Sequence, residues 1–527
     1  MAFELLKDPD VLLSADRKRL AFDLAHPLAQ KLRAVVKGPV QDLEGKPRLV
    51  LPYSHHVFLS AQAVGMALPS PIRHDYVWKG RFKPFRHQVA TAAFFTRYTK
   101  GFCFNDLGVG KTLSALWAAD FLMEQGVVHK ALVLSPLSTL SPTWASEIFA
   151  NFPHRRYHVL HGRGKALLKE AGSFFIANHE IVRDRAFTKK ILEDPQFDLL
   201  IVDECAMFRN GQTDKWKGLN VLTQRMARVW LMTGAPTPNS PTDAWAQIRL
   251  LFPDRVSRSF VDFRSQVMVA RGPYKWEPKP DAESTIRRLM VPCIRFAAKD
   301  CIDLPPLTFE RRAVEMTAEQ KVLYKTMAKQ FLIELEGRQI TAANEAVLAS
   351  KLLQLGCGIA IHEEGVIRIN TPKTQVLDEI IEQTDGKLIV FAPFISVVNH
   401  VAARLKGYKV GVITGGTPRG ERDGLVRSFQ HEKDGVRILV AQPSTMSHGL
   451  TLTAAATMVW FAPVWSNDTY QQAVGRIYRQ GQKRHCTVIE LESSPVERAI
   501  YSRLRERQRM QGALLELLRK EATGKGL

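Results

Sequence analysis

Short runs of apolar and β-branched residues constrain the fold of this chain more than any other feature of its sequence. Each run is continuous and not alternately polar, and turn residues and then a helical pattern follow it. Continuous apolar runs are typical of strands covered on both faces, as in parallel sheets flanked by helices. The runs form two groups, at 131–136, 174–178, 199–204 and 229–234, and at 388–393, 437–443 and 458–463. We therefore predict an α/β fold with two parallel-sheet lobes.

The stretch between the two groups differs in character, because it is rich in arginine, proline and helix-forming residues. Apolar residues recur at helical spacing in 317–338 and 342–356, and glycine stands where each helix would stop. A chain of 527 residues is also too long for one hydrophobic core. The predicted divisions are an N-terminal accessory region at 1–75, a first lobe at 76–252, a helical insertion and linker at 253–371, a second lobe at 372–500 and a basic C-terminal helix at 501–527.

A glycine-rich turn lies between a short apolar segment and a helical pattern in the first lobe. A strand, a glycine turn and a helix start bring backbone N–H groups and the helix dipole together, which suits a phosphate group. Lys111 would supply a positive charge to the β and γ phosphates, and the Thr112 hydroxyl would bind Mg²⁺. A tight turn with an incidental lysine is the alternative. The predicted nucleotide contacts in this turn are Asn105, Asp106, Leu107, Gly108, Val109, Gly110, Lys111 and Thr112.

An acidic pair stands at the end of the apolar run 199–204. Asp203 and Glu204 would lie at the carboxyl end of a buried strand, where open α/β sheets bind their ligands. Asp203 would hold Mg²⁺ through water, and Glu204 would orient or deprotonate the attacking water. A solvated pair that caps the next helix is the alternative. Together with the glycine turn upstream, the pair indicates a nucleotide hydrolase.

The segment 470–482 carries two arginines, Arg476 and Arg479, three residues apart on one helical face. Arginines offered from a second lobe can neutralise charge on the departing γ-phosphate and so couple hydrolysis to lobe closure. A basic surface helix is the alternative, but it does not explain Gln472 and Gly475 at their spacings. The predicted catalytic residues are Lys111, Asp203, Glu204, Gln472, Arg476 and Arg479.

The order of these motifs over about 80–505 resembles helicase superfamily two and, within it, the Swi/Snf-type ATPases. FRHQ at 85–88 resembles the adenine-reading Q motif, which makes Gln88 the implied base contact. DECAMFRN at 203–210 resembles the extended DEAH box. MTGAPTPN at 232–239 resembles the motif that links hydrolysis to nucleic-acid binding. The resemblance implies two RecA-like lobes that use ATP and Mg²⁺.

Two further segments resemble parts specific to this family. Residues 295–324 are similar to the segment that ends the first lobe of these translocases, and the helices after it correspond to their helical protrusion. SHGLTLTAA at 447–455 resembles the motif that touches the tracked strand, with a leaning toward the annealing, fork-remodelling branch. Asn105 departs from the family, which usually has an acidic residue there. The resemblance implies a near-minimal ATP-dependent motor on double-stranded DNA.

Hydroxyl, amide and aromatic side chains that follow the predicted strands are candidates for contacts with the nucleic-acid backbone. Each alone could equally be a capping or loop residue, and its place after a strand is what favours a contact. The candidates are Ser135, Thr139, Asn178, His179, Thr445, His448, Thr451 and, from the resemblance, Trp465.

The charge balance favours a polyanionic partner, because 73 Lys and Arg against 52 Asp and Glu leave a formal charge of +21. A membrane surface would also attract such a chain, although no apolar stretch is long enough to span a bilayer.

Six scattered cysteines and an N-terminus without a signal-peptide core predict a cytoplasmic protein, which we expect to be a monomer. An RNA helicase, a nuclease-coupled motor and a non-catalytic nucleic-acid-binding scaffold are the alternatives.

Overall fold

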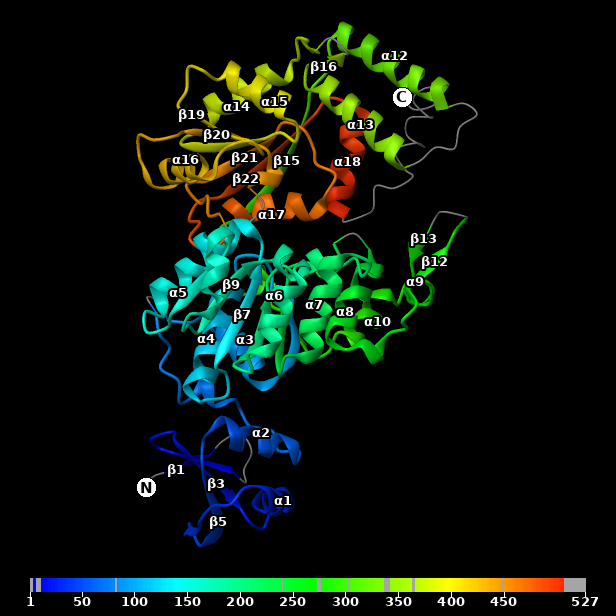
Figure 1. The fold of residues 1–527 in the computed structure, drawn as a ribbon. Coiled ribbons are helices and arrows are strands. Elements are labelled where there is room, and N and C mark those ends of the chain that lie inside the picture. The colour runs from blue at the N-terminus through cyan, green and yellow to red at the C-terminus, as the bar shows by residue number, and fades with distance from the viewer. Residues whose placement is uncertain are drawn as a thin grey trace. The chain divides into compact units, whose positions relative to one another are not determined.

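The computed structural model describes residues 3–5, 11–80, 83–238, 240–272, 276–301, 304–335, 342–362, 365–446 and 450–506. The chain divides into two compact units (Figure 1). The first comprises residues up to 301, apart from 237–241 and 268–278, and the second comprises those two segments and the chain from 302 onward. In the described part of the chain, no helix is long and apolar enough to cross a membrane.

The N-terminal part of the first unit is a small antiparallel sheet with two helices and a core of its own. The strand order is β1-β2-β3-β5-β4. Phe22, Leu32 and Phe58 are among the buried residues at its centre. The sequence did not predict this fold for 1–75. The elements are β1 (Phe3–Leu5), β2 (Val11–Ser14), β3 (Arg19–Asp23), α1 (Pro27–Val35), β4 (Val40–Leu43), β5 (Lys46–Pro52) and α2 (His55–Ala63).

The rest of the first unit is lobe 1, which is built on a seven-stranded sheet in the order β14-β6-β11-β10-β7-β9-β8. All of its neighbouring strands are parallel. Four of them coincide with the apolar runs of the first group, as expected for strands covered on both faces. The strands are β6 (Lys100–Cys103), β7 (Lys130–Ser135), β8 (Tyr157–Leu160), β9 (Phe174–Asn178), β10 (Phe197–Val202), β11 (Arg228–Met232) and β14 (Cys293–Ile294).

Helices pack against the lobe 1 sheet through apolar faces. Trp117 of α4 and Phe95 of α3 belong to the same buried cluster as Ile201 and Trp230 of the sheet. The helices of this unit after α2 are α3 (Arg86–Arg97), α4 (Lys111–Glu124), α5 (Ser146–Asn151), α6 (Arg185–Glu193), α7 (Asp214–Arg225), α8 (Ala244–Leu251), α9 (Phe260–Val267), α10 (Ala282–Leu289) and α11 (Ala298–Cys301).

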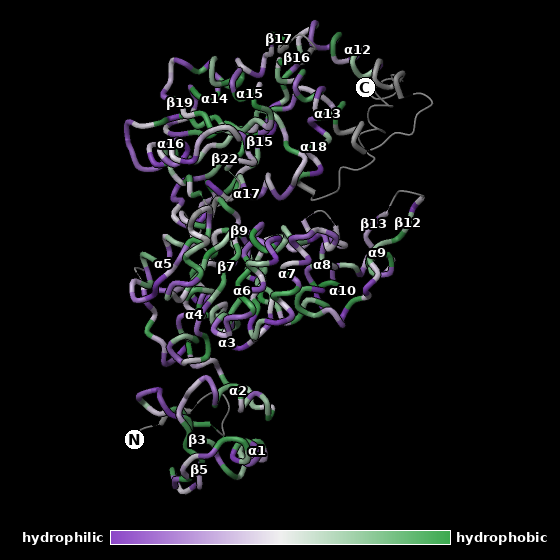
Figure 2. The backbone as a smooth tube through the Cα atoms, in the orientation of Figure 1, coloured by the Kyte–Doolittle hydropathy of each residue, from purple (hydrophilic) through white to green (hydrophobic). Residues whose placement is uncertain are grey.

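The second unit contains lobe 2, whose six-stranded parallel sheet has the order β15-β22-β21-β18-β20-β19. Separate apolar clusters cover its two faces, with Ile389 in one and Val390 in the other. The outer helix α16 is largely hydrophilic and buries only Phe429 (Figure 2). The strands are β15 (Leu307–Ala313), β18 (Lys387–Phe391), β19 (Val410–Ile413), β20 (Ile438–Ala441), β21 (Ala455–Trp460) and β22 (Cys486–Glu492). The predicted α/β fold with two parallel-sheet lobes is confirmed.

The helices predicted between the lobes are present, and α13 contributes Leu348 and Leu352 to the lobe 2 core. The predicted insertion at 253–371 is not one body, however. Its β14 joins the lobe 1 sheet, whereas its β15 pairs with β22 of lobe 2. The helices of the second unit are α12 (Ala318–Leu335), α13 (Ala342–Gly356), α14 (Lys373–Gln383), α15 (Ile395–Arg404), α16 (Arg419–His431), α17 (Asn467–Ile477) and α18 (Pro495–Glu506), beside the hairpins β12 (Met268–Ala270)–β13 (Trp276–Pro278) and β16 (Ile359–His362)–β17 (Gly365–Arg368). Of the predicted C-terminal helix, 507–527 lies outside the described residues.

Candidate nucleotide site

The glycine turn of lobe 1 leaves β6 and enters α4 through a left-handed residue. Gly110 precedes the first residue of α4 and has φ 80°, and Gly108 has φ 82°. This conformation favours glycine, because a Cβ would meet the backbone. A Cβ on Gly110 would also lie 2.0 Å from the Gln88 side-chain nitrogen. The turn is therefore packed closely against Gln88, the predicted adenine contact.

Lys111 is the first residue of α4, and its side chain folds back onto the turn. Its exposed fraction is 8%, and Nζ donates hydrogen bonds to the carbonyl oxygens of Asn105 at 2.8 Å and Asp106 at 3.1 Å. Within the described part of the chain, no carboxylate forms an ion pair with Lys111. Carbonyl dipoles offset only part of an ammonium charge, so the turn retains positive charge that an anion can bind.

The start of α3 supports the turn from one side. The imidazole of His87 contacts the carbonyl oxygen of Val109 at 3.1 Å. Because a carbonyl oxygen can only accept, the ring nitrogen donates. Burial lowers the pKa of His87, which favours the neutral ring. Gln88 turns its amide oxygen to the backbone N–H of Phe85 at 2.9 Å. His87 was not among the predicted site residues, although it lies inside the Q-motif segment 85–88.

Asp203 follows β10 and is held by several donors. One carboxylate oxygen accepts from the Trp144 indole at 3.0 Å and the Ser135 hydroxyl at 3.2 Å. The other accepts from the backbone N–H of Glu204 at 3.1 Å. These bonds fix the orientation of the carboxylate at the end of its strand. Trp144, nine residues after the end of β7, was not among the predicted site residues.

Glu204 adopts φ 50° and ψ 50°, a left-handed conformation that is rare outside glycine. One of its carboxylate oxygens accepts from the Thr233 hydroxyl at 3.2 Å. Thr233 directly follows β11, the strand between β6 and β10. Strained backbone conformations of this kind gather at functional sites. The structure thus joins the acidic pair to the segment predicted to link hydrolysis to nucleic-acid binding, of which Asn239 lies outside the described residues.

A hydroxyl and a carboxylate at this edge of the sheet could hold a divalent cation. The Thr112 hydroxyl forms no hydrogen bond with another described residue. The Asp203 oxygen that accepts only from the N–H of Glu204 retains acceptor capacity for a cation. Oxygen ligands of these two kinds are those that Mg²⁺ prefers. The donor set therefore fits Mg²⁺.

Three predicted nucleic-acid contacts of lobe 1 have other roles in this structure. Ser135 is fully buried and His179 is 3% exposed. His179 contacts the backbone carbonyl of Asp203 at 2.7 Å, and Ser135 bonds to its carboxylate and to Thr139. Asn178 caps the following turn by accepting from the N–H of Glu180. Ser135 and His179 are both buried against the acidic pair and support it. Neither is therefore accessible to a nucleic-acid strand in this structure.

Asn105 also has a role different from the predicted nucleotide contact. Its side chain is fully buried. The amide nitrogen donates to the Thr91 hydroxyl, and the amide oxygen accepts from the N–H of Phe296. Leu107 lies beside Gly234, at the end of β11. The backbone carbonyl oxygen of Asn105, and not its side chain, accepts from Lys111 in the turn.

In lobe 2 the two predicted arginines converge on one backbone atom. Arg476 of α17 and Arg479 beyond it each donate to the Leu450 carbonyl oxygen at 3.0 Å. Gln472 is 3% exposed and donates to the Asp468 carboxylate at 3.0 Å. Both guanidinium groups therefore contact the segment predicted to touch the tracked strand, Arg476 from α17 and Arg479 from the turn after it.

The other candidates of lobe 2 surround that segment. Thr451 is exposed, and the half-buried Thr445 donates its hydroxyl to the Gln442 carbonyl. Trp465 is partly buried against the lobe core. Ser447 and His448 lie outside the described residues. Gln482 was not among the predicted residues. Its buried amide donates to the carbonyls of Ala455 and Ile477 and so holds the turn after α17.

Fold and site together define a two-lobed P-loop protein of the helicase type. Residues 87–357, just over half of the chain, match the SNF2-related domain, and residues 372–481 match the helicase conserved C-terminal domain. The chain belongs to the SNF2-related family, as the motifs indicated.

Similar proteins come from very different sources. Putative protein p41 of Acyrthosiphon pisum secondary endosymbiont phage 1 is 25% identical over 79% of this chain and 94% of its own length. The probable ATP-dependent DNA helicase CHR12 of Arabidopsis thaliana is 24% identical over 80% of this chain, which spans only 40% of that relative. The Sulfolobus solfataricus SWI2/SNF2 ATPase core in complex with dsDNA is 21% identical, with a TM-score of 0.41 over 85% of this chain and 95% of that one.

Proposed function

We propose that this chain hydrolyses ATP in lobe 1 and uses the cycle to move on or remodel double-stranded DNA. The observation that carries the proposal is a buried lysine at the same sheet edge as an oriented acidic pair. β6 and β10 flank β11, so Lys111 and Asp203 follow strands that end at one edge. Ligands of open α/β sheets bind at that edge.

Each residue has a defined part in this chemistry. Lys111 would turn from the two carbonyls to the β and γ phosphates. Thr112 and Asp203 would hold Mg²⁺, which when bound neutralises charge on phosphate oxygens. Glu204 would orient the attacking water and accept its proton. Gln88, packed against Gly110, would contact the base.

Lobe 2 would supply positive charge to the same reaction. Arg476 of α17 and Arg479 just beyond the helix both donate to the Leu450 carbonyl, so their guanidinium groups already lie together. Arginines from a second lobe can stabilise charge on a departing phosphate. We propose that these two do so when the lobes close on ATP.

The choice of duplex DNA rests on three supports. The CHR12 relative is described as a DNA helicase. The helices α12 and α13 stand where the family resemblance has a duplex-gripping protrusion. The charge of +21 favours a polyanionic partner. A monomeric state and a cytoplasmic location belong to this proposal.

The proposal is tested by ATP turnover with duplex DNA, single-stranded DNA and RNA. Duplex DNA should raise turnover sharply, and the stimulation should weaken with salt, because phosphate contacts release counterions. The protein should displace the third strand of a triplex and leave a short-tailed duplex paired. Stimulation by RNA alone, or efficient unwinding of the tailed duplex, would overturn the translocase function. Glu204→Gln should bind ATP without hydrolysing it, and turnover at the parent rate would exclude Glu204 as the base.

The arginine assignment has its own test. Arg476→Ala or Arg479→Ala should lower turnover about a thousandfold, the usual scale for an arginine that contacts the departing phosphate. Binding of DNA without nucleotide should change far less. An equal loss of turnover and of DNA binding would place these arginines on the DNA-binding surface instead.

A further inference from the structure

The chain segment that leads out of lobe 1 lies directly beside the nucleotide-binding turn. β14 pairs with β6, with Ile294 opposite Cys103. The pairing continues past the strand ends, because the N–H of Asp106 donates to the carbonyl of Phe296 at 3.0 Å. The turn and this outgoing segment are thus joined along their backbones.

Two side chains of the turn strengthen this connection. The amide oxygen of Asn105 accepts from the N–H of Phe296 at 2.9 Å, while its nitrogen donates to the Thr91 hydroxyl at 2.8 Å. One carboxylate oxygen of Asp106 accepts from the N–H of Ala298 at 3.1 Å. Successive residues of the turn therefore hold the segment 296–298.

Asparagine suits position 105 for a physical reason. The Thr91 hydroxyl already donates its hydrogen to the carbonyl of His87 at 2.8 Å, so its oxygen needs a donor. The Asn105 amide gives that donor and still accepts from Phe296. The acidic residue usual in the family would lack the donor. The departure noted in the sequence thus makes a complete buried link.

The same two residues also hold the phosphate-binding lysine. The carbonyls of Asn105 and Asp106 accept from Lys111, and their side chains hold Phe296 and Ala298. Cys301, three residues after Ala298, is the last residue of the first unit, and the chain from 302 onward belongs to the second. A continuous set of direct contacts therefore runs from the lysine to the start of the connection between units.

We propose that Asn105 and Asp106 couple nucleotide occupancy at Lys111 to the segment that connects the two units. The inference rests on the proposed ATP-binding function. When Lys111 turns to phosphate, the two carbonyls lose their donor, and the turn shifts together with the residues its side chains hold. This coupling acts within one lobe, through covalent continuity of the chain, and is separate from the arginines of lobe 2.

The test removes the donor at Ala298 and leaves the turn unaltered. Ala298 is the first residue of α11, a position at which proline is tolerated because its N–H is not needed by the helix. Ala298→Pro abolishes the bond to Asp106, and Ala298→Ser keeps it as the matched control. We expect basal turnover and the KM for ATP to stay within about twofold of the parent. The stimulation by DNA should fall at least about fivefold, the lower end of usual coupling factors, and Ala298→Ser should match the parent.

A second measurement needs no DNA. Small-angle scattering of the full chain should show a nucleotide-dependent change in radius of gyration with a non-hydrolysable ATP analogue at saturation. Ala298→Pro should reduce this change and Ala298→Ser should preserve it. If Ala298→Pro does not fold, Asp106→Ala is measured in the same way, with saturation checked by direct binding.

The outcomes separate the coupling from the proposed function. A parent that binds the analogue without a change in radius of gyration would overturn the coupling and leave hydrolysis standing. So would an Ala298→Pro protein with parental stimulation and parental scattering. A parent that neither binds nor hydrolyses ATP would overturn the proposed function, and the coupling with it.

Discussion

Lys111 of lobe 1 and Lys373 of lobe 2 occupy the same local position in different surroundings. Each is the first residue of a helix, α4 or α14, and each is buried. The Lys111 ammonium is held by two backbone carbonyls. The Lys373 ammonium instead forms a fully buried ion pair with Glu497, at 2.5 Å.

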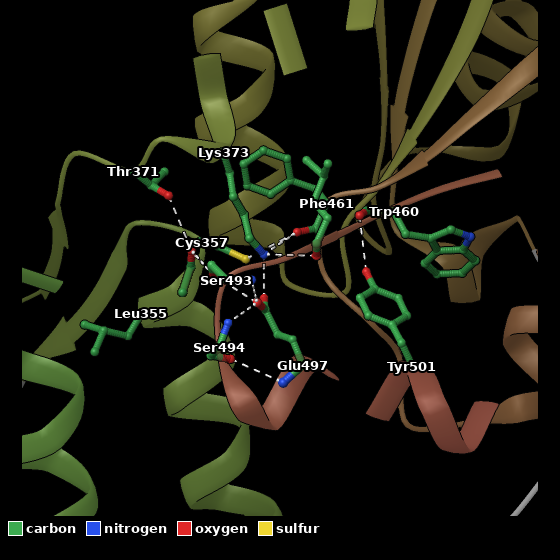
Figure 3. Close-up of polar contacts among 12 residues, drawn as sticks. Leu355, Cys357, Thr371, Lys373, Trp460, Phe461, Ser493, Ser494, Glu497 and Tyr501 are labelled. Carbon is green, nitrogen blue, oxygen red and sulfur yellow. Dashed lines mark hydrogen bonds and ion pairs between the residues drawn. The ribbon is translucent and has the colours of Figure 1, made fainter. Parts of the chain in front are cut away.

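The surroundings of Lys373 leave no role for an added anion. Figure 3 shows its ammonium among Glu497 and the carbonyl of Phe461, and it also reaches the carbonyl of Leu491. The second Glu497 oxygen accepts from the backbone and hydroxyl of Ser493. This cluster connects α14, α18, β22 and the residue that follows β21. A lysine at a helix start therefore marks a phosphate site only where no carboxylate already neutralises it.

The largest expected effect separates the two lysines by activity. Lys111→Met should lower ATP turnover about a thousandfold or more, because loss of one preorganised charge at a reacting phosphate has that scale. Lys373→Met should leave the turnover of the folded fraction within a few fold, since its ammonium faces a carboxylate. Turnover per mole of folded protein is the measurement. An equal loss in both variants would contradict the distinction drawn from their partners.

For the stability of the protein the order reverses, and Lys373 should matter more than Lys111. Lys373→Met leaves the Glu497 carboxylate buried without its cation, which costs about 3–5 kcal/mol. Replacing both partners, as Lys373→Met with Glu497→Leu, should recover most of that loss, because burial of two apolar groups needs no compensation. Urea denaturation of the singles and the double variant measures the coupling. A double variant as unstable as Lys373→Met would show that packing, and not charge, dominates this cluster.

The contrast between the lysines also shows what the sequence could reveal. The glycine spacing and the acidic pair lie within short segments, so Lys111, Asp203 and Glu204 could be proposed as site residues from the sequence. Lys373 and Glu497 are 124 residues apart, and no local pattern connects them. The continuous apolar runs predicted the central strands. β14 and β15 escaped prediction because Cys293–Ile294 is too short and Leu307–Ala313 carries charged, half-exposed residues.

The direction in which a side chain points was the other feature that the sequence could not predict. Position after a strand suggested that Ser135 and His179 reach a nucleic acid, but both turn inward to Asp203. Residues that follow parallel strands can face the ligand or the neighbouring strand end, and the sequence does not distinguish these directions. Asn105 was predicted as a nucleotide contact because it begins the glycine turn, but its amide faces Thr91 and Phe296 instead.

The residues before the two lysines sharpen the comparison. Gly110 has a left-handed φ of 80°, whereas Pro372 has φ −62°. Gly110→Ala should cost about 1–2 kcal/mol of backbone strain and should also displace Gln88, which raises the KM for ATP. Pro372→Ala should change stability by less than about 1 kcal/mol, chiefly through the unfolded chain. Denaturation midpoints and KM values test both. An unchanged KM in Gly110→Ala would contradict the close packing of Gln88 against the turn.

The smallest expected effect concerns the two glutamates, Glu204 in its left-handed conformation and Glu497 in α18. Both Glu204→Gly and Glu204→Ala lose the carboxylate, so their difference in stability isolates the backbone. A left-handed alanine carries about 1–2 kcal/mol of strain that glycine avoids. Flexibility of the unfolded glycine chain offsets about 0.4–1 kcal/mol of this. Glu204→Gly should therefore be the more stable of the two by up to about 1.6 kcal/mol. At position 497 the order should reverse, because alanine is favoured over glycine in a helix by about 1 kcal/mol. Denaturation of the four variants shows whether glycine or alanine is the more stable at each position. A Glu204→Ala protein more stable than Glu204→Gly would contradict strain at the acidic pair.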